Sequence, residues 1–420
     1  MPSSIRKALN ELPTTLDETY ERALQEIPKE KREHAHRMFQ CLVVAIRPLR
    51  VEELAELFAI EFDRDAGSSL KEGWRPESPE DAVLSACSTL IAVIENRGSK
   101  IVQFSHFSVK EYLTSDRLRT SSVDHYHIPL DAAHTILARA CLTVLLQLDE
   151  NVDKKRLKTF PLALYAAQHW VDHAKYEDVA SRVQGAIEEL FNPSKPYLAA
   201  WIWIHDADLN GKKETINDLE ERPERPDGTA LYYAALCGFS GLANYLIITH
   251  GENVYAKCGE RGSPLHAASD TGNLDVVRLL LAHGVDINTE SDDESTPLHL
   301  ASLNGYVDVT RLLLQHNANL NARDDIEDAP LHNASIRGNT RVAQLLLEHG
   351  ADINSRGCFN CTPLYRASEN GHLELVQLLL GHGADVHLRG ENDREPFEVA
   401  TWRGHTEIAQ LLLEHGAEKE

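Results

Sequence analysis

The sequence is poor in the features that mark secreted, membrane-spanning and nucleic-acid-binding proteins. Its seven cysteines are an odd number and widely scattered, which does not suit a disulfide framework. The N-terminus has no apolar core followed by a cleavage site, and no apolar run is long enough to cross a bilayer. Basic residues are also scarce: 42 Lys and Arg face 65 Asp and Glu, and the net charge of −23 opposes broad adhesion to nucleic acid or anionic lipid. These absences predict a reduced, cytoplasmic protein.

Catalytic motifs are missing as well. The sequence contains no G-x-S-x-G nucleophile elbow, no H-E-x-x-H helix, no Gly-rich dinucleotide loop and no G-x-x-x-x-G-K-[ST] phosphate loop. Carboxylates are plentiful, but they concentrate in expected turns and on helix surfaces, where exposure to water explains them. We therefore expect no enzymatic activity, no cofactor and no metal.

The second half of the chain repeats itself every 33 residues. Four copies of a seven-residue motif align without a gap, a divergent copy begins 34 residues before them, and another follows 33 residues after them. Six units at one spacing indicate a fold in which each unit covers its neighbour. The copies are TALYYAA from Thr229, SPLHAAS from Ser263, TPLHLAS from Thr296, APLHNAS from Ala329, TPLYRAS from Thr362 and EPFEVAT from Glu395.

Each unit is predicted to form two helices. Thr296 can cap a helix that begins at Pro297, because a proline at that position loses no hydrogen bond. A glycine such as Gly305 then ends the first helix. The second helix carries a Leu triplet and is apolar over most of its circumference, which suits a helix packed between neighbours. Gly284 and its counterparts fit the left-handed residue that ends the second helix, and Asn317 replaces the glycine in one unit.

This unit, with its TPLH signature and its LLLxHGADIN ending, resembles the ankyrin repeat. The resemblance covers residues 229–420 and implies a protein-interaction scaffold or sensor that uses the concave face formed by turn fingers and first helices. The outermost units depart from the motif as caps should, with charges at Glu395, Glu398 and in the tail 418–420. The implied units are 229–262, 263–295, 296–328, 329–361, 362–394 and 395–420.

The first half of the chain has no such repeat and shows a different pattern of predicted elements. Residues 32–46 and 51–60 predict two helices, Pro79–Thr89 predicts a third, and Leu90–Ile94 with Ile101–Phe104 predict a β-hairpin. Three helices and a hairpin predict a winged helix at residues 30–118. The helical patterns on either side predict an N-terminal helical segment at 1–29 and a helical linker at 119–220, which ends in a charged, Pro-rich junction at 220–228. The predicted fold class is mainly α: a winged helix and a helical linker followed by an α-solenoid of about six ankyrin repeats.

Two details of the winged helix are also predicted. Ser108 and Glu111 form a capping box for the helix after the hairpin, with Phe107 and Tyr112 as its hydrophobic staple. His106 is expected to be a satisfied core histidine.

Several segments of the first half are similar to the winged helix that follows the nucleotide-binding NACHT module in fungal NLR-like (STAND) proteins. They are residues 5–20, Arg47–Ala55, Phe104–Leu113 and Phe160–Trp170. This resemblance implies a signalling receptor switched by NTP, with the nucleotide module before residue 1. Because the chain contains no phosphate loop, it is not expected to be a nucleotide switch by itself. A truncated relative, a wrong start and a fragment remain equal alternatives.

A winged helix can also bind DNA, so a DNA-binding regulator is a further alternative. The candidate recognition helix, Pro79–Leu90, has two acids and no Lys or Arg. Phosphate contacts supply much of the affinity of such domains, and only Arg97 and Lys100 in the wing have the right charge. Packing is the favoured role, and we expect neither a nucleic-acid nor a membrane partner.

Most histidines and cysteines are given structural roles. His266, His299 and His332 share one repeat position, where the ankyrin resemblance implies a bond from the imidazole to the capping Ser or Thr. Cys358 and Cys361 are expected to be an exposed thiol pair, because a zinc site would need further ligands that nothing nearby supplies.

The two residues before the glycine that ends each first helix differ from unit to unit. Variation at a position fixed by the fold indicates that packing does not dictate it, so these pairs are expected to face a partner. Leu303, Ile336 and Trp402 place apolar groups there, and Phe359 does so at a finger tip. Trp and Arg anchors with a polar rim are typical of interfaces. Packing on the neighbouring unit is the alternative, and for Trp402 it would be capping of the last unit.

The fingers are acidic. Residues 229–420 hold 13 Lys and Arg against 27 Asp and Glu. Solubility alone explains this excess of acid. The more specific hypothesis is that the acidic finger tips attract a basic segment of a partner protein. The predicted partner, a protein or peptide, would contact Asp270, Asp293, Leu303, Asn304, Asp325, Ile336, Arg337, Phe359, Glu369, Asn370, Trp402 and Arg403.

Overall fold

The computed structural model describes residues 15–63, 67–96, 98–149, 151–205, 216, 219 and 227–417. Contacts divide the described residues into two compact units, one made of residues up to 219 and the other of residues 227–417. Most of the predicted junction 220–228 lies outside the described residues, and so do residues 1–14 and the tail 418–420. None of the helices in the described ranges is long and apolar enough to span a membrane.

The first unit contains the predicted winged helix. Its helices are α3 (Arg32–Val44), α4 (Val51–Glu56) and α5 (Pro79–Cys87), and its wing is the antiparallel hairpin of β4 (Ile91–Asn96) and β5 (Ser99–Phe104). Strand β1 (Leu49–Arg50) pairs with β5 and completes a sheet of order β1–β5–β4. The core is apolar and includes Phe39, Leu54, Val83 and Val102.

One predicted helix of this domain is shorter than expected. The pattern at 51–60 predicted a helix throughout, but α4 ends at Glu56. A 3₁₀ turn at Leu57–Ala59 leads into strand β2 (Ile60–Asp63), which pairs with β3 (Gly67–Leu70) in a hairpin that the sequence did not predict. The last apolar residues of the pattern therefore form a 3₁₀ turn, and Ile60 begins a strand.

The predicted cap of the next helix is wrong. Helix α6 (Phe107–Thr114) begins one residue before Ser108, and its cap is His106, whose Nδ1 accepts a hydrogen bond from the Ser108 N–H at 3.3 Å. His106 has the extended backbone that a cap needs, with φ at −147°. It is exposed, not a core residue, and Phe107 is 71% exposed, so it cannot act as a buried staple.

The remaining helices of the first unit surround this domain. Helix α8 packs against both α3 and α10, so the winged helix and the helical linker share a core. Within the predicted linker, residues 179–190 form two short helices that meet at Val183. The helices are α2 (Leu16–Gln25), α7 (Asp116–Arg119), α8 (Leu130–Leu145), α9 (Lys154–Leu157), α10 (Ala163–Ala174), α11 (Val179–Arg182), α12 (Gln184–Leu190) and α13 (Tyr197–Ile204).

A buried ion-pair network joins the winged helix to the linker. The Glu53 side chain is fully buried, and both its oxygens accept hydrogen bonds from Arg47, at 2.7 and 2.8 Å. Arg50 adds another at 2.8 Å. Burial alone would raise the pKa of Glu53, but the bonds from Arg47 and Arg50 outweigh it and lower that pKa. The Arg47 guanidinium also lies 4.9 Å from the Tyr165 ring centroid, and Tyr165 accepts the Ile46 N–H at 3.2 Å.

A second buried carboxylate reinforces this junction. Glu56 accepts the Leu162 N–H at 2.7 Å and pairs with Arg75 at 2.6 Å. Burial raises the pKa of Glu56 despite these partners. The segments around Arg47 and Phe160 that carry the second resemblance are therefore joined directly to each other.

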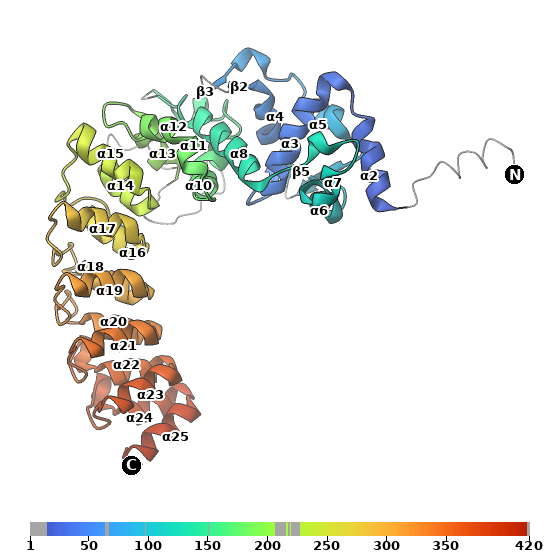
Figure 1. The fold of residues 1–420 in the computed structure, drawn as a ribbon. Coiled ribbons are helices and arrows are strands. Elements are labelled where there is room, and N and C mark those ends of the chain that lie inside the picture. The colour runs from blue at the N-terminus through green and yellow to red at the C-terminus, as the bar shows by residue number, and fades with distance from the viewer. Residues whose placement is uncertain are drawn as a thin grey trace, which may run out of the picture. The chain divides into compact units, whose positions relative to one another are not determined.

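In residues 227–417 the second unit contains six helix pairs, stacked in sequence order (Figure 1). Each first helix contacts the next first helix, and each second helix the next second helix, which produces two rows. The first helices are α14 (Ala230–Cys237), α16 (Pro264–Asp270), α18 (Pro297–Asn304), α20 (Pro330–Arg337), α22 (Pro363–Asn370) and α24 (Pro396–Arg403). The second helices are α15 (Ser240–His250), α17 (Leu274–Ala282), α19 (Val307–Gln315), α21 (Thr340–Glu348), α23 (Leu373–Gly381) and α25 (Thr406–Glu414).

The predicted signals that begin and end these helices are confirmed. Pro297 is the first residue of α18, and Gly305 ends that helix with φ at 78°. Gly284 is left-handed at φ 76°, and Asn317 takes the same conformation at φ 64°. Because glycine and asparagine tolerate positive φ best, the helix ends are fixed by local residue choice.

Buried histidines bond to the cap of their own helix, as the ankyrin resemblance implied for Ser263 and Thr296, and they also connect successive units. His266 Nδ1 accepts from the Ser263 hydroxyl at 2.7 Å, and its Nε2 donates to the Ser295 carbonyl of the next unit at 2.9 Å. His299 repeats both bonds, and its Nδ1 also accepts the Thr296 N–H at 3.0 Å. His332 accepts the Ala329 N–H at 3.1 Å, but the predicted bond to a capping hydroxyl is absent there because alanine has none. Burial lowers the pKa of His266 to about 4, which keeps the ring neutral and able to accept.

Candidate partner-binding surface

Most of the predicted contact residues lie at the ends of the first helices, and Asp293, Asp325 and Phe359 lie in the fingers. We call the two residues before each helix-ending glycine the turn pair. Among the second residues of these pairs, Asn304, Arg337, Asn370 and Arg403 are exposed. Among the first residues, Asp270, Leu303, Ile336 and Glu369 are half-buried, whereas Trp402 is 62% exposed. The turn pairs thus form a partly open row along the array.

Turn pairs of adjacent units are in contact. The Asn304 amide donates to the Asp270 carboxylate at 2.9 Å, and Asp270 also pairs with Arg261. Three units later in the same register, Arg403 pairs with Glu369 at 2.7 Å. At these two places the second residue of a pair reaches back to the first residue of the preceding pair, whereas the Asn370 amide donates to the Arg366 carbonyl of its own helix.

The last two units carry a cluster of arginines, one carboxylate and one tryptophan. Glu369 pairs with Arg366 at 3.2 Å and with Arg403 at 2.7 Å. Guanidinium groups from Arg403 and Arg394 lie 4.4 and 5.0 Å from the Trp402 ring centroid. The exposed indole is therefore held in place by cations that contact its ring.

The same contacts reach the finger that carries Phe359. Arg366 donates to the Cys358 carbonyl at 3.1 Å, and the Cys358 N–H donates to the buried Asp328 at 2.8 Å. Phe359 itself is 68% exposed and has a left-handed backbone, with φ at 53°. The hydrogen bonds made by the backbone of the preceding residue, Cys358, keep Phe359 in this conformation. Arg366 thereby links the finger of Phe359 to the Glu369 pair.

Arg366 and Arg394 were missed in the sequence. Neither belongs to a turn pair, and variation between units did not single them out. Their contacts with Glu369 and Trp402 depend on side-chain packing across units.

The expected exposed thiol pair is not present. Cys361 is fully buried and packs with Tyr365 and Val399, and Cys358 is half-buried. Cys361 faces the next unit at a position where its small apolar side chain fills the core.

The acidic fingers are only partly available to a partner. The Asp293 carboxylate accepts from the hydroxyls of Ser291 and Ser295, at 2.5 and 3.2 Å, within its own finger. Burial opposes ionisation there, but the Ser291 and Ser295 bonds outweigh it and lower the pKa of Asp293. Asp324 is buried, which raises its pKa to about 6. Asp325 is exposed and donates only its backbone N–H, to the Asp293 carbonyl.

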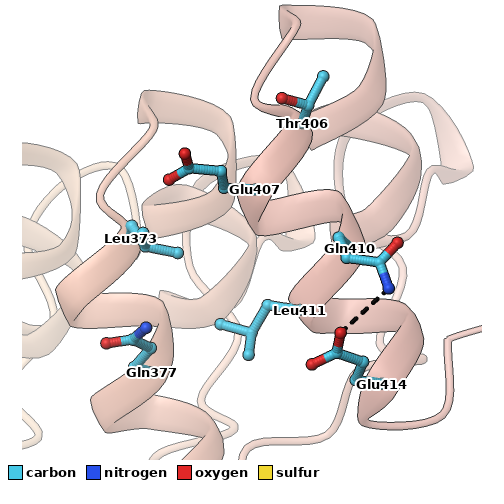
Figure 2. A pocket seen from close by; sticks show the side chains of 7 residues that line it. All are labelled: Leu373, Gln377, Thr406, Glu407, Gln410, Leu411 and Glu414. Carbon is cyan, nitrogen blue, oxygen red and sulfur yellow. Dashed lines mark hydrogen bonds between the residues drawn. The ribbon is translucent and has the colours of Figure 1, made fainter.

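A shallow groove lies between α23 and α25, in the row of second helices (Figure 2). Its rim is polar, and Gln410 donates to Glu414 at 3.0 Å. None of the predicted contact residues lines it. Leu373, Gln377, Thr406, Glu407, Gln410, Leu411 and Glu414 form its walls.

One of the two cations predicted for the wing is engaged within the winged helix. Lys100 pairs with Glu80 of α5 at 2.5 Å, so one of the two candidate cations is neutralised by the candidate recognition helix itself. Arg97, the other, lies outside the described residues.

Stacked helix pairs with a variable, partly exposed row of turn pairs define a helical-repeat interaction protein. Ankyrin-repeat models match residues 203–291, 231–324, 265–357 and 331–420, and the chain belongs to the ankyrin-repeat family. The winged-helix domain of GPI inositol-deacylase matches residues 20–123.

One curated relative is named azaphilone pigments biosynthesis cluster protein L, from Monascus ruber. It is 32% identical over 286 residues, which are 65% of this chain and 60% of the relative. The chain therefore spans less than two thirds of that relative's length.

Proposed function

We propose that the protein is a non-enzymatic interaction scaffold or sensor whose partner binds along the turn pairs and fingers of the ankyrin array. The observation that carries this proposal is Trp402, a large apolar side chain that is 62% exposed yet fixed by Arg394 and Arg403. Exposed, ordered aromatic residues flanked by arginine are the usual anchors of protein interfaces.

Site-specific photo-crosslinking tests this proposal. A benzophenone amino acid in place of Arg337, at the end of a first helix, should yield a crosslinked partner in cells that make the protein. The matched position is Arg341, which is exposed at the start of a second helix of the same unit. Equal crosslinking from both positions, or crosslinking from Arg341 alone, would place the interface elsewhere.

The finer hypothesis of a basic partner concerns the fingers. Asp325 supports it because its carboxylate is exposed, whereas Asp293 is engaged within its finger. Asp325→Lys should slow association and flatten its dependence on salt, because electrostatic steering acts mainly on the association rate. Asp293→Lys would also disturb the finger and is the weaker test. An association rate that Asp325→Lys leaves unchanged would remove the basic-partner hypothesis.

A second candidate function is the C-terminal part of a NACHT-type receptor. The winged-helix match at residues 20–123 favours it, together with the length of the relative outside the matched region. Transcripts that extend upstream of Met1 in frame and encode a phosphate loop would support this candidate, and transcripts that start immediately before Met1 would count against it.

A further inference from the structure

The first helices differ in charge between the two halves of the array. Helices α14, α16 and α18 carry no Lys or Arg, and their only charged residue is Asp270. Helices α20, α22 and α24 carry Arg337, Arg366 and Arg403 together with the acids Glu369 and Glu398, and Arg394 lies two residues before α24. Because the array as a whole is acidic, this gathering of arginines on one row is not explained by composition.

Few acids form ion pairs with these arginines. Among residues 227–417 Glu369 is shared between Arg366 and Arg403, and the buried Asp328 also acts electrostatically on Arg366. In the described part of the chain, no carboxylate lies within ion-pair distance of Arg394, whose recorded side-chain contact is with the Trp402 ring. The cluster therefore has an excess of positive charge beside an exposed indole.

Arg337 adds to this excess for a geometric reason. In the register of the array, the second residue of a turn pair can reach the first residue of the preceding pair, as Asn304 reaches Asp270. For Arg337 that preceding residue is Leu303, which has no charge. Among the described residues Arg337 forms no ion pair, and its side chain is exposed.

We propose that Arg337, Arg366, Arg394, Trp402 and Arg403, together the arginine–tryptophan face, bind an acidic peptide segment of a partner protein. The inference rests on the proposed function and names the chemistry of the partner at these three units. It is separate from the basic-partner hypothesis, which concerns the acidic fingers of earlier units.

The geometry suits carboxylates in particular. A guanidinium that lies over an indole presents its face to the ring, and the N–H groups at its edge remain free to donate to a carboxylate in a paired, planar arrangement. Trp402 then offers apolar area to a neighbouring side chain of the same segment. An acidic segment with an apolar residue among its acids would fulfil both conditions.

Nucleic acid, the other polyanion, fits this face less well. Its affinity comes from many phosphate contacts along a charged path, and an array with 13 Lys and Arg against 27 Asp and Glu repels a long polyanion. A short acidic segment can approach the few arginines without running along the acidic fingers.

Selection of a displayed library of random 16-residue peptides on the full chain tests the inference. We expect enrichment of sequences rich in Asp and Glu around an apolar residue, with Kd weakened about tenfold or more by Trp402→Ala and about three- to tenfold by Arg394→Gln or Arg337→Gln. Trp402→Phe should restore part of the loss. Trp74→Ala and Arg341→Gln are the matched controls, because Trp74 is 57% exposed in the first unit and Arg341 lies on a second helix.

The other outcomes overturn different claims. Peptides that are basic or uncharged but lose binding with Trp402→Ala would overturn the acidic-segment inference and leave the proposed function standing. Peptides unaffected by all first-helix variants, or no enrichment at all, would count against both. Competition by a 16-nucleotide single-stranded DNA at equal concentration would assign the face to nucleic acid instead. Melting temperatures within 2 °C of wild type, roughly the shift of a fraction of a kcal/mol, establish that each variant is folded.

Discussion

The winged-helix unit and the ankyrin array use polar groups in different ways. In the first unit, the buried Glu56 bonds to Leu162, more than 100 residues away, and the buried Glu53 pairs with Arg47, whose guanidinium lies over Tyr165. In the array, His266 and His299 make the same two bonds in successive units. The first unit therefore depends on a few long-range charges, and the array on many short-range contacts between neighbours.

The largest expected effect is a loss of stability in the first unit alone. Glu53→Ala leaves Arg47 and Arg50 without their buried carboxylate, and we expect it to lower the free energy of unfolding of that unit by about 3 kcal/mol. Denaturant unfolding followed by tryptophan fluorescence should report this, since Trp170, Trp201 and Trp203 are buried there. Glu52→Gln is the matched control because Glu52 is exposed. A loss below 1 kcal/mol would mean that the network is not essential.

The second largest expected effect is a dependence of the stability of the array on pH. His266 must be neutral when folded, with its pKa at about 4, whereas the unfolded chain takes up a proton below about pH 6.5. His266 thus contributes fully to the free energy of unfolding of the array above pH 6.5. This contribution is lost as the pH falls towards 4, by up to about 1.4 kcal/mol per pH unit.

His266→Gln tests this because glutamine does not titrate. The variant should reduce the pH dependence of array unfolding between pH 6.5 and 4.5 by up to that slope, measured by urea unfolding at several pH values. His382→Gln, at an exposed position after α23, should leave the slope unaltered. An identical slope for wild type and His266→Gln would show that the ring is not the titrating group.

A smaller effect separates binding from stability within the array. Ile336 is half-buried at the end of α20, so Ile336→Ala should cost about 1 kcal/mol or less of stability yet weaken partner binding. Leu346→Ala in the same unit removes a fully buried side chain and should cost about 2–5 kcal/mol. If Ile336→Ala unfolds the array, its side chain belongs to the core and not to the interface.

For nucleotides we expect no effect on stability. ATP and GTP should leave the melting temperatures of both units unchanged, because the chain contains no phosphate loop with backbone N–H groups to hold phosphates. Differential scanning fluorimetry with each nucleotide and Mg²⁺ checks this. Saturable stabilisation of the first unit by either nucleotide would contradict the expectation.

Much of the fold was predictable because its signals are local. Pro297 and Gly305 mark the ends of one helix by their own backbone preferences, and the period of 33 repeats those marks. The hairpin of β2 and β3 was missed because Gly67, Ser68 and Ser69 carry no apolar alternation. The cap at His106 was missed because histidine is not among the usual capping residues.

The candidate surface was likewise predictable only in part. The sequence by itself determined the six repeats, the positions of the turn pairs and the excess of acid, because each of these follows from residue identity at a fixed spacing. Only the tertiary structure decided that Asp293 is engaged by Ser291 and Ser295, that Lys100 is paired with Glu80, and that Arg394 lies over Trp402. Such contacts depend on which side chains adjacent elements bring together, and spacing along one chain does not encode them.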